Sequence, residues 1–201
     1  MTFSPAAAIR ALEAVQLAYD KPTLWGGSGQ AYTALDALGG PVIAIAGTNA
    51  KRDAIQDSMF WRKEIGQGRE VHAGFWHHWK GIEKPLTEVA FLPAILAGHS
   101  LGAATAVLLV AMHPSRFAGS EVYLYGCPRV GNQNFATVFE ADCARLGIQV
   151  WRIVSKGDLV AELNLPGDWA HVGLEISFGR GGDLEPDHRM SAYRAALEAM
   201  L

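Results

Sequence analysis

The sequence lacks the features that mark several classes of protein. It has no run of about 20 apolar residues that could form a membrane-spanning helix. It also has no block of like charges, and its net charge is only −3, so nothing indicates a nucleic-acid partner or an electrostatic membrane anchor. We therefore expect a small or neutral substrate.

Cysteines are scarce, and the first segment does not have the pattern expected of a signal peptide. Cys127 and Cys143 are the only two cysteines, too few for a disulfide framework, so both are predicted to be free thiols. Arg10 and Glu13 interrupt the first apolar stretch, which argues against a signal peptide. These features favour a cytoplasmic location, although a mature secreted chain would have the same composition.

The sequence does contain enough apolar material for a full core. Its 201 residues are 50% hydrophobic, which fits one domain over residues 1–201. The apolar pattern switches between the periods of strands and helices, which predicts an α/β fold with a mostly parallel sheet flanked by helices. Strands are predicted at 31–36, 42–47, 94–98, 121–126, 150–155 and 171–178. Helices are predicted at 5–19, 51–63, 74–90, 101–112, 132–146 and 188–200.

The segment AGHSLGAA, residues 97–104, joins a predicted buried strand to a predicted helix. Ser100 lies in this turn between Gly98 and Gly102. A strand, a tight turn and a helix around G-x-S-x-G form a nucleophile elbow, because small neighbours allow a strained backbone at the serine. The N–H groups at the start of the helix would face a developing oxyanion. This context disfavours the alternative, an ordinary serine in a glycine-rich turn.

A serine nucleophile requires a base and an orienting acid, which in this fold follow the serine in the order acid, then histidine. Asp158 follows the predicted strand at 150–155, at the sheet edge where catalytic groups gather. His188, where a loop runs into the last predicted helix, is the favoured base. His171, inside an alternating strand pattern, remains the alternative base. His99 is not a candidate, because adjacent side chains diverge at such a turn.

Several stretches together resemble the class 3 lipase family, which includes fungal triacylglycerol lipases and the related feruloyl esterases. The segment GHSLGAA is similar to the nucleophile elbow of that family, and AIAGT and VHAGFW resemble two segments that precede it. The longest match is YGCPRVGNQNFA, followed in the family's order by RIVSKGDLVAELN, HVGLEI and DHRMSAY. The resemblance runs from about residue 31 to residue 193 and implies the α/β-hydrolase fold.

This resemblance implies a serine carboxylic-ester hydrolase, a lipase or esterase that forms an acyl-enzyme on a small-molecule or lipid ester. Ser100 would be the nucleophile, Asp158 the acid and His188 the base, with no metal and no organic cofactor. Thr48 and Leu101 match the oxyanion-hole positions. The alternatives are a phospholipase, feruloyl esterase, thioesterase or acyltransferase with the same triad, and last a non-catalytic binding module.

Residues 49–63 match the mobile lid of the family. Ile55 and Met59 are four residues apart on one helical face with Phe60 at its edge, so they are predicted to line the acyl pocket and to contact a lipid interface transiently. Ala46 replaces the family's usual arginine just before this lid, and Arg52 and Arg62 are the candidates to take its place. The alternative is an ordinary surface helix.

Other polar residues are assigned structural roles. His72, His77 and His78 are close in sequence, but their spacing and the lack of accompanying carboxylate or cysteine ligands argue against a metal site. Arg129 and Asn132 are predicted to fix the turn that follows their strand.

Overall fold

The computed structural model describes residues 2–37, 40–48, 61–162, 167–179 and 188–201. Seven strands form the main sheet in the order β1-β2-β3-β6-β7-β9-β11. The pairs β1/β2 and β2/β3 are antiparallel, whereas the neighbours from β3 to β11 are parallel. These strands are β1 (Leu24–Gly26), β2 (Gly29–Ala37), β3 (Gly40–Ile45), β6 (Ile95–His99), β7 (Glu121–Tyr125), β9 (Gln149–Ser155) and β11 (Leu174–Phe178).

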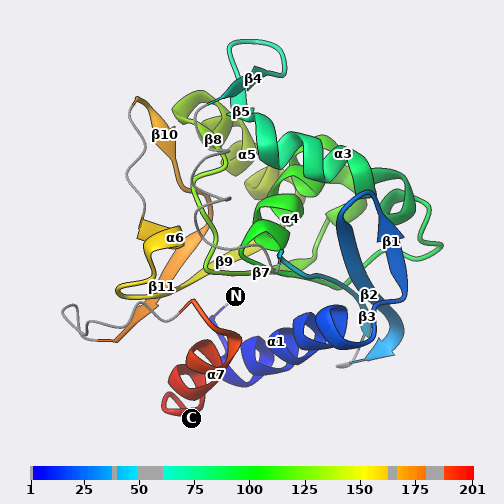
Figure 1. The fold of residues 1–201 in the computed structure, drawn as a ribbon, viewed down its shortest axis with the longest axis vertical. Helices are drawn as coiled ribbons and strands as arrows, with labels where there is room; N and C mark the ends of the chain where they lie inside the picture. Colours follow the sequence, from blue (N-terminus) through cyan, green and yellow to red (C-terminus); the bar gives the residue numbers. More distant parts are fainter. Residues whose placement is uncertain (1, 38–39, 49–60, 163–166, 180–187) are drawn as a thin grey trace.

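Helices cover both faces of this sheet (Figure 1). On one face α1 and α7 lie side by side, and on the other lie α3, α4 and α5. Within β3, Val42 and Ala44 pack toward α1, whereas Ile43 and Ile45 pack toward α3 and α4. All four side chains are buried, as the short continuous apolar runs predicted. These helices are α1 (Pro5–Asp20), α3 (Ala73–Thr87), α4 (Leu101–Met112), α5 (Gln133–Leu146) and α7 (Met190–Glu198).

The first and last of these helices are held in place by local and distant contacts. The hydroxyl of Ser4 accepts a hydrogen bond from the N–H of Ala7 at 3.3 Å, which caps α1 where the sequence predicted its start. Arg194 on α7 donates to Glu13 on α1 at 2.8 Å. The two helices therefore form one layer beneath the sheet.

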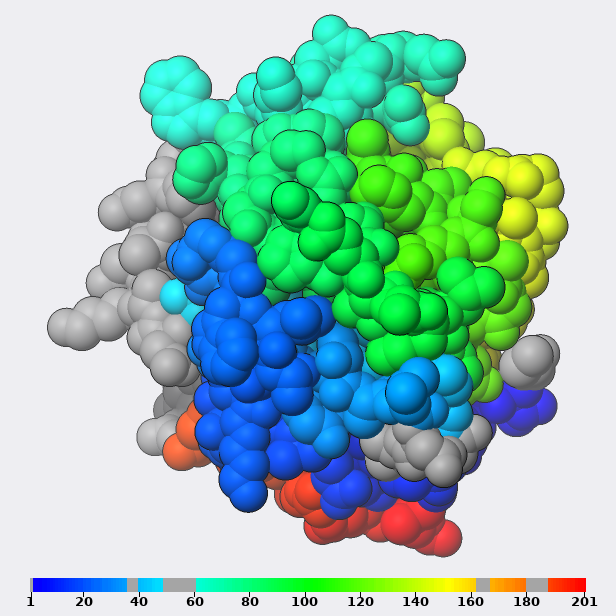
Figure 2. Space-filling view, turned by 90° about the vertical axis from the view of Figure 1, so that its right-hand side faces the viewer, coloured from blue at the N-terminus to red at the C-terminus, as the bar shows by residue number. Residues whose placement is uncertain are grey.

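At the edge of the main sheet, strand β1 packs closely on α3. A Cβ atom at Gly26 would lie 2.4 Å from the carbonyl oxygen of Gly81, so only glycine allows this approach. Figure 2 shows the resulting face, on which the first strands lie against the green helices. Cys127 and Cys143 are buried elsewhere in the core and are free, as predicted.

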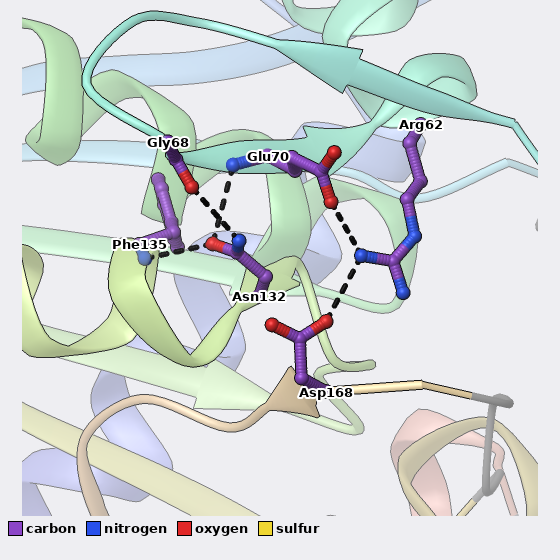
Figure 3. A network of polar contacts seen from close by, with 6 residues as sticks. All are labelled: Arg62, Gly68, Glu70, Asn132, Phe135 and Asp168. Carbon is purple, nitrogen blue, oxygen red and sulfur yellow. Dashed lines mark hydrogen bonds and ion pairs between the residues drawn. The ribbon is translucent and has the colours of Figure 1, made fainter.

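A second, antiparallel sheet has the order β10-β8-β5-β4. Its strands are β4 (Arg62–Glu64), β5 (Glu70–His72), β8 (Gly131–Asn132) and β10 (Trp169–Ala170). Asn132 joins them, since its side-chain oxygen accepts from the N–H groups of Phe135 at 2.9 Å and Glu70 at 3.2 Å (Figure 3). Its amide also donates to the carbonyl of Gly68 at 3.0 Å. This confirms the structural role predicted for Asn132.

Arg62 is the ionic link of the same sheet. Its Nη1 donates to Glu70 on β5 and, at 2.9 Å, to Asp168 next to β10 (Figure 3). The guanidinium also lies 4.8 Å from the ring centroid of Trp169. The described contacts of Arg62 therefore anchor the small sheet.

Two predictions about local structure are wrong. The helix predicted at 51–63 is wrong at its C-terminal end, where Arg62 and Lys63 belong to β4; its residues 51–60 lie outside the described residues. His171 lies between β10 and β11 and not inside a strand. Strands of two or three residues are too short to show a period of two, so β4 and β10 left no signal. The described part of the chain also contains two short helices, η2 (Pro114–Phe117) and α6 (Leu159–Glu162). None of its helices is long and apolar enough to span a membrane.

Candidate active site

Ser100 occupies a strained backbone position between β6 and α4. Its φ is 57° and its ψ is −124°, a combination that costs a residue other than glycine roughly 1–3 kcal/mol. Neighbouring backbone fixes this conformation, because the N–H of Ser100 donates to the carbonyl of Tyr125 at 2.9 Å. The carbonyl of Ser100 accepts from Ala103 at 3.0 Å in the first turn of α4. The predicted elbow geometry is therefore present.

The two glycines of the elbow are required by packing. A Cβ atom at Gly98 would lie 2.5 Å from the carbonyl oxygen of Gly102. A Cβ atom at Gly102 would lie 2.3 Å from the carbonyl oxygen of Ile45 on β3. Both distances are far below normal contact, so any side chain would push the strand and the helix apart.

Asp158 and His188 form a hydrogen-bonded pair beyond the end of β9. His188 Nδ1 lies 2.7 Å from Asp158 Oδ2. The same oxygen accepts from the hydroxyl of Tyr193 at 2.6 Å, and Oδ1 accepts from the N–H of Val160 at 2.9 Å. These contacts leave the carboxylate fully buried but well supplied with donors.

Two opposing effects act on the pKa of Asp158. Burial raises it, but hydrogen bonds from His188, Tyr193 and Val160 and the charge of His188 lower it more, so the net pKa lies below its usual value. The carboxylate is therefore ionised. It directs the proton of His188 to Nδ1, because only a donor can face a carboxylate. Nε2 of His188 is buried and has no hydrogen-bond partner in the described part of the chain.

Gly126 places this pair next to the serine. It follows Tyr125, the residue whose carbonyl accepts from Ser100. A Cβ atom at Gly126 would lie 2.9 Å from Asp158 Oδ2 and 2.9 Å from His188 Cε1. The end of β7 therefore contacts the elbow through Tyr125 and lies against the Asp158–His188 pair at Gly126.

The residues predicted for the oxyanion hole lie at two neighbouring chain segments. Thr48 follows β3, and a Cβ at the preceding Gly47 would lie 3.0 Å from the Cβ of Ser100. Leu101 is the first residue of α4, where a helix leaves its N–H groups without intrahelical partners. A pocket of about 430 Å³ opens beside them, lined by Gln16, Tyr19, Asp20, Thr48, His99, His188, Arg189 and Met190.

The other histidines have different surroundings. Of the two candidate bases, His188 is the one that pairs with Asp158. Burial and the charges of Arg152 and Arg129 lower the pKa of the other, His171, to about 3. His72 caps the start of α3, and Nδ1 of His78 lies 2.9 Å from Thr105 Oγ1. Ile55, Met59 and Phe60, predicted to line the acyl pocket, lie outside the described residues.

Sequence reasoning missed three contributors to the site: Gly126, Tyr193 and Tyr19. Gly126 and Tyr193 both lie inside stretches that resemble the family, YGCPRVGNQNFA and DHRMSAY, so their positions carried a signal. Tyr19, at the end of α1, carried none, because its contacts depend on how α1 packs beneath the sheet.

The mostly parallel sheet, the strained serine and the flanking helices define an α/β-hydrolase fold, which confirms the predicted class. The family Lipase (class 3) matches residues 42–167, more than half of the chain. The chain belongs to this family, as its resemblance implied.

Known relatives agree with this assignment. The phospholipase A1 EG1, chloroplastic/mitochondrial, of Oryza sativa subsp. indica is 33% identical over 125 residues, 51% of this chain and 27% of the relative. The secreted mono- and diacylglycerol lipase A of Penicillium cyclopium is 32% identical over 122 residues, 55% and 40% of the two chains. The chain thus matches less than half of either relative's length. The crystal structure of a lipase from Rhizopus microsporus var. chinensis aligns with a TM-score of 0.63 and 26% identity, over 86% of this chain and 73% of that chain.

Proposed function

We propose that the protein is a serine carboxylic-ester hydrolase in which Ser100, His188 and Asp158 form the catalytic triad. One observation carries the proposal. A serine held at a φ of 57° and a histidine whose Nδ1 lies 2.7 Å from a buried carboxylate both lie against the end of β7, at Tyr125 and Gly126. A strained serine and an oriented imidazole are the two parts that acyl transfer requires. Membership of the class 3 lipase family supports the same chemistry.

The mechanism follows from the proton positions. His188 Nε2 takes the proton of Ser100 while Oγ attacks the ester carbonyl, and the resulting imidazolium is stabilised by Asp158. Nε2 then protonates the departing alcohol, which leaves an acyl group on Oγ. Water, deprotonated by Nε2, attacks this acyl-enzyme and releases the acid, and the proton returns to Ser100.

The oxyanion of each tetrahedral intermediate needs hydrogen-bond donors on the side of Ser100 opposite His188. We assign this role to the N–H and hydroxyl of Thr48 and to the N–H of Leu101. Their segments meet at the elbow, since Gly47 approaches the Ser100 side chain and Leu101 starts the helix behind it. The loss of one such donor typically costs about 2.7–4 kcal/mol of transition-state stabilisation.

The substrate class follows from the relatives. The names of the two relatives above describe a phospholipase and an acylglycerol lipase, so we propose an acyl ester of a glycerolipid as substrate. We also propose that the segment at 49–63 acts as a lid, with Met59 on the acyl chain and brief contact with a lipid surface. Met59→Ala should then slow the hydrolysis of long acyl esters more than that of acetates.

The location of the protein is a separate proposal. Two buried free cysteines fit a reducing compartment, which favours the cytoplasm, whereas the name of the Penicillium relative describes a secreted protein. Fractionation of the source cells, with detection of the chain in cytoplasm and medium, decides between them.

The central test combines a covalent probe with a substrate series. A fluorophosphonate should label the folded protein once, and Ser100→Ala should remove the label. p-Nitrophenyl esters of increasing acyl length, followed by acylglycerol, phospholipid and feruloyl esters, should rank the substrates. Labelling at another serine, or folded protein that neither reacts with the probe nor hydrolyses any ester, would overturn the proposal.

A further inference from the structure

Tyr19, the penultimate residue of α1, contacts two segments of the candidate site through one oxygen. Its Oη accepts a hydrogen bond from the N–H of Gly47 at 2.8 Å. The same oxygen lies 2.8 Å from Nδ1 of His99, the residue before the serine. His99 in turn places its Nε2 2.8 Å from the carbonyl oxygen of His188. A chain of hydrogen bonds therefore runs from Gly47 and Thr48, called the oxyanion segment below, to the backbone of the proposed base.

The direction of every bond in this chain is determined. The N–H of Gly47 can only donate, so Oη accepts there and has one proton left to give to His99 Nδ1. The carbonyl of His188 can only accept, so the proton of His99 is on Nε2. The two requirements agree on one neutral tautomer of His99.

The surroundings keep both side chains neutral. Burial, with the nearby charge of His188 as the next contribution, lowers the pKa of His99 to about 4. Burial raises the pKa of Tyr19 to about 12, against the opposing hydrogen bond from Gly47. At neutral pH the chain of bonds is therefore complete.

We infer that Tyr19 and His99 are positioning residues that hold the oxyanion segment and the proposed base at a fixed separation across Ser100. This inference rests on the proposed function. His99 does not act as a second base, because both ring nitrogens are engaged and its ring packs against that of His188 with centroids 4.6 Å apart. Tyr19 and His188 both lie outside residues 42–167, the range that the family Lipase (class 3) matches, so this link depends on parts of the chain that flank that range.

The competing explanation is that Tyr19 only fills space beneath the sheet. Tyr19→Phe separates the two explanations, because it removes one oxygen and leaves the ring. Positioning predicts a fall in kcat of about 10- to 100-fold on a soluble short-chain ester, with KM changed by less than about 3-fold. Tyr123→Phe is the matched control, since it removes a hydroxyl bonded to Glu121 from another buried ring of the same core. It should keep the wild-type kcat.

A double-mutant cycle tests whether the two residues act as one unit. His99→Asn should also lower kcat, and Tyr19→Phe combined with His99→Asn should be no worse than the more damaged single variant. Imidazole nitrogen NMR gives a readout besides activity: His99 should be the Nε2–H tautomer in the wild-type protein.

The outcomes separate this inference from the proposed function. A wild-type protein that hydrolyses no ester and takes no fluorophosphonate overturns the proposed function, whatever the tautomer of His99. An active wild-type protein whose Tyr19→Phe and Tyr123→Phe variants share one kcat overturns the inference alone. So does a multiplicative loss in the double variant, or an Nδ1–H tautomer of His99. Melting temperatures of all variants show whether a fall in kcat reflects unfolding instead.

Discussion

Substitution of Gly126 by alanine should slow catalysis while the protein stays folded. The residue has a φ of +57°, which already disfavours any side chain. The added methyl would lie 2.9 Å from Asp158 Oδ2 and 3.0 Å from His188 Nδ1, the two atoms that face each other in the proposed acid–base pair. The change therefore acts on the orientation of the imidazole.

The size of the effect follows from these contacts. Carbon atoms in unstrained contact lie about 3.5 Å or more from their neighbours, so the pair must move by roughly 0.5 Å. Displacements on this scale exceed the tolerance of a catalytic constellation, and about 1 Å can cost 10²-fold in rate. We expect kcat/KM to fall by about 10- to 100-fold, or roughly 1.4–2.7 kcal/mol of transition-state stabilisation. The backbone strain of alanine should lower the free energy of unfolding by about 1–2 kcal/mol.

Gly147 provides the matched control. It has a φ of +68° at the end of α5, but a Cβ there would meet no atom within 4 Å. Gly147→Ala should therefore carry the same backbone strain and keep the wild-type rate. Urea unfolding measures the stability of both variants, and initial rates on p-nitrophenyl butyrate measure activity. Equal rates in the two alanine variants, at equal stability, would refute the reasoning about Gly126.

Three further predictions concern the proposed triad and its surroundings. Asp158→Asn should lower kcat by about 10⁴ without unfolding the protein, because the imidazole would lose the partner that fixes its tautomer, and a loss below 10-fold would remove Asp158 from the triad. His188→Ala should abolish ester hydrolysis and His171→Ala should not; the reverse result would assign the base to His171. The pKa of His99 is lowered to about 4 in the folded protein. Below about pH 6.5 this imidazole is therefore protonated in the unfolded chain but still neutral in the folded protein. Stability is therefore full above pH 6.5 and falls toward pH 4, by roughly 2 kcal/mol at pH 5 in urea unfolding, and the fall should be smaller in His99→Asn.

The middle of the main sheet could be predicted from sequence because β3, β6, β7 and β9 are largely buried on both faces, whereas the short, partly exposed β1 was not predicted. β6, β7 and β9 appear as short apolar runs separated by helical periods, and the family resemblance covers the same region. The small sheet could not be predicted, since β8 and β10 have two residues each. A pattern of two residues has no period, and these strands are held by contacts such as those of Asn132 with Gly68 and Glu70.

The candidate site also has residues that could be predicted from local sequence and residues that could not. The position of Ser100 follows from a local motif, and its strained conformation is a property of that motif. The order of acid and histidine along the chain identified Asp158 and His188, and the structure brings these two together. The support from Tyr19 depends on how α1 packs beneath the sheet, which no local pattern encodes.

The packing of α7 on α1 has a consequence for how the protein is made. Ser100 and the proposed oxyanion-hole residues precede His188 in the chain, so they leave the ribosome first. The growing chain therefore contains the proposed nucleophile before it contains the proposed base. On the proposed mechanism, ester hydrolysis begins only when α7 has docked on α1 through contacts such as Arg194 with Glu13. Assembly of the last described helix would then act as the activation step, and no cleavage of the chain would be required.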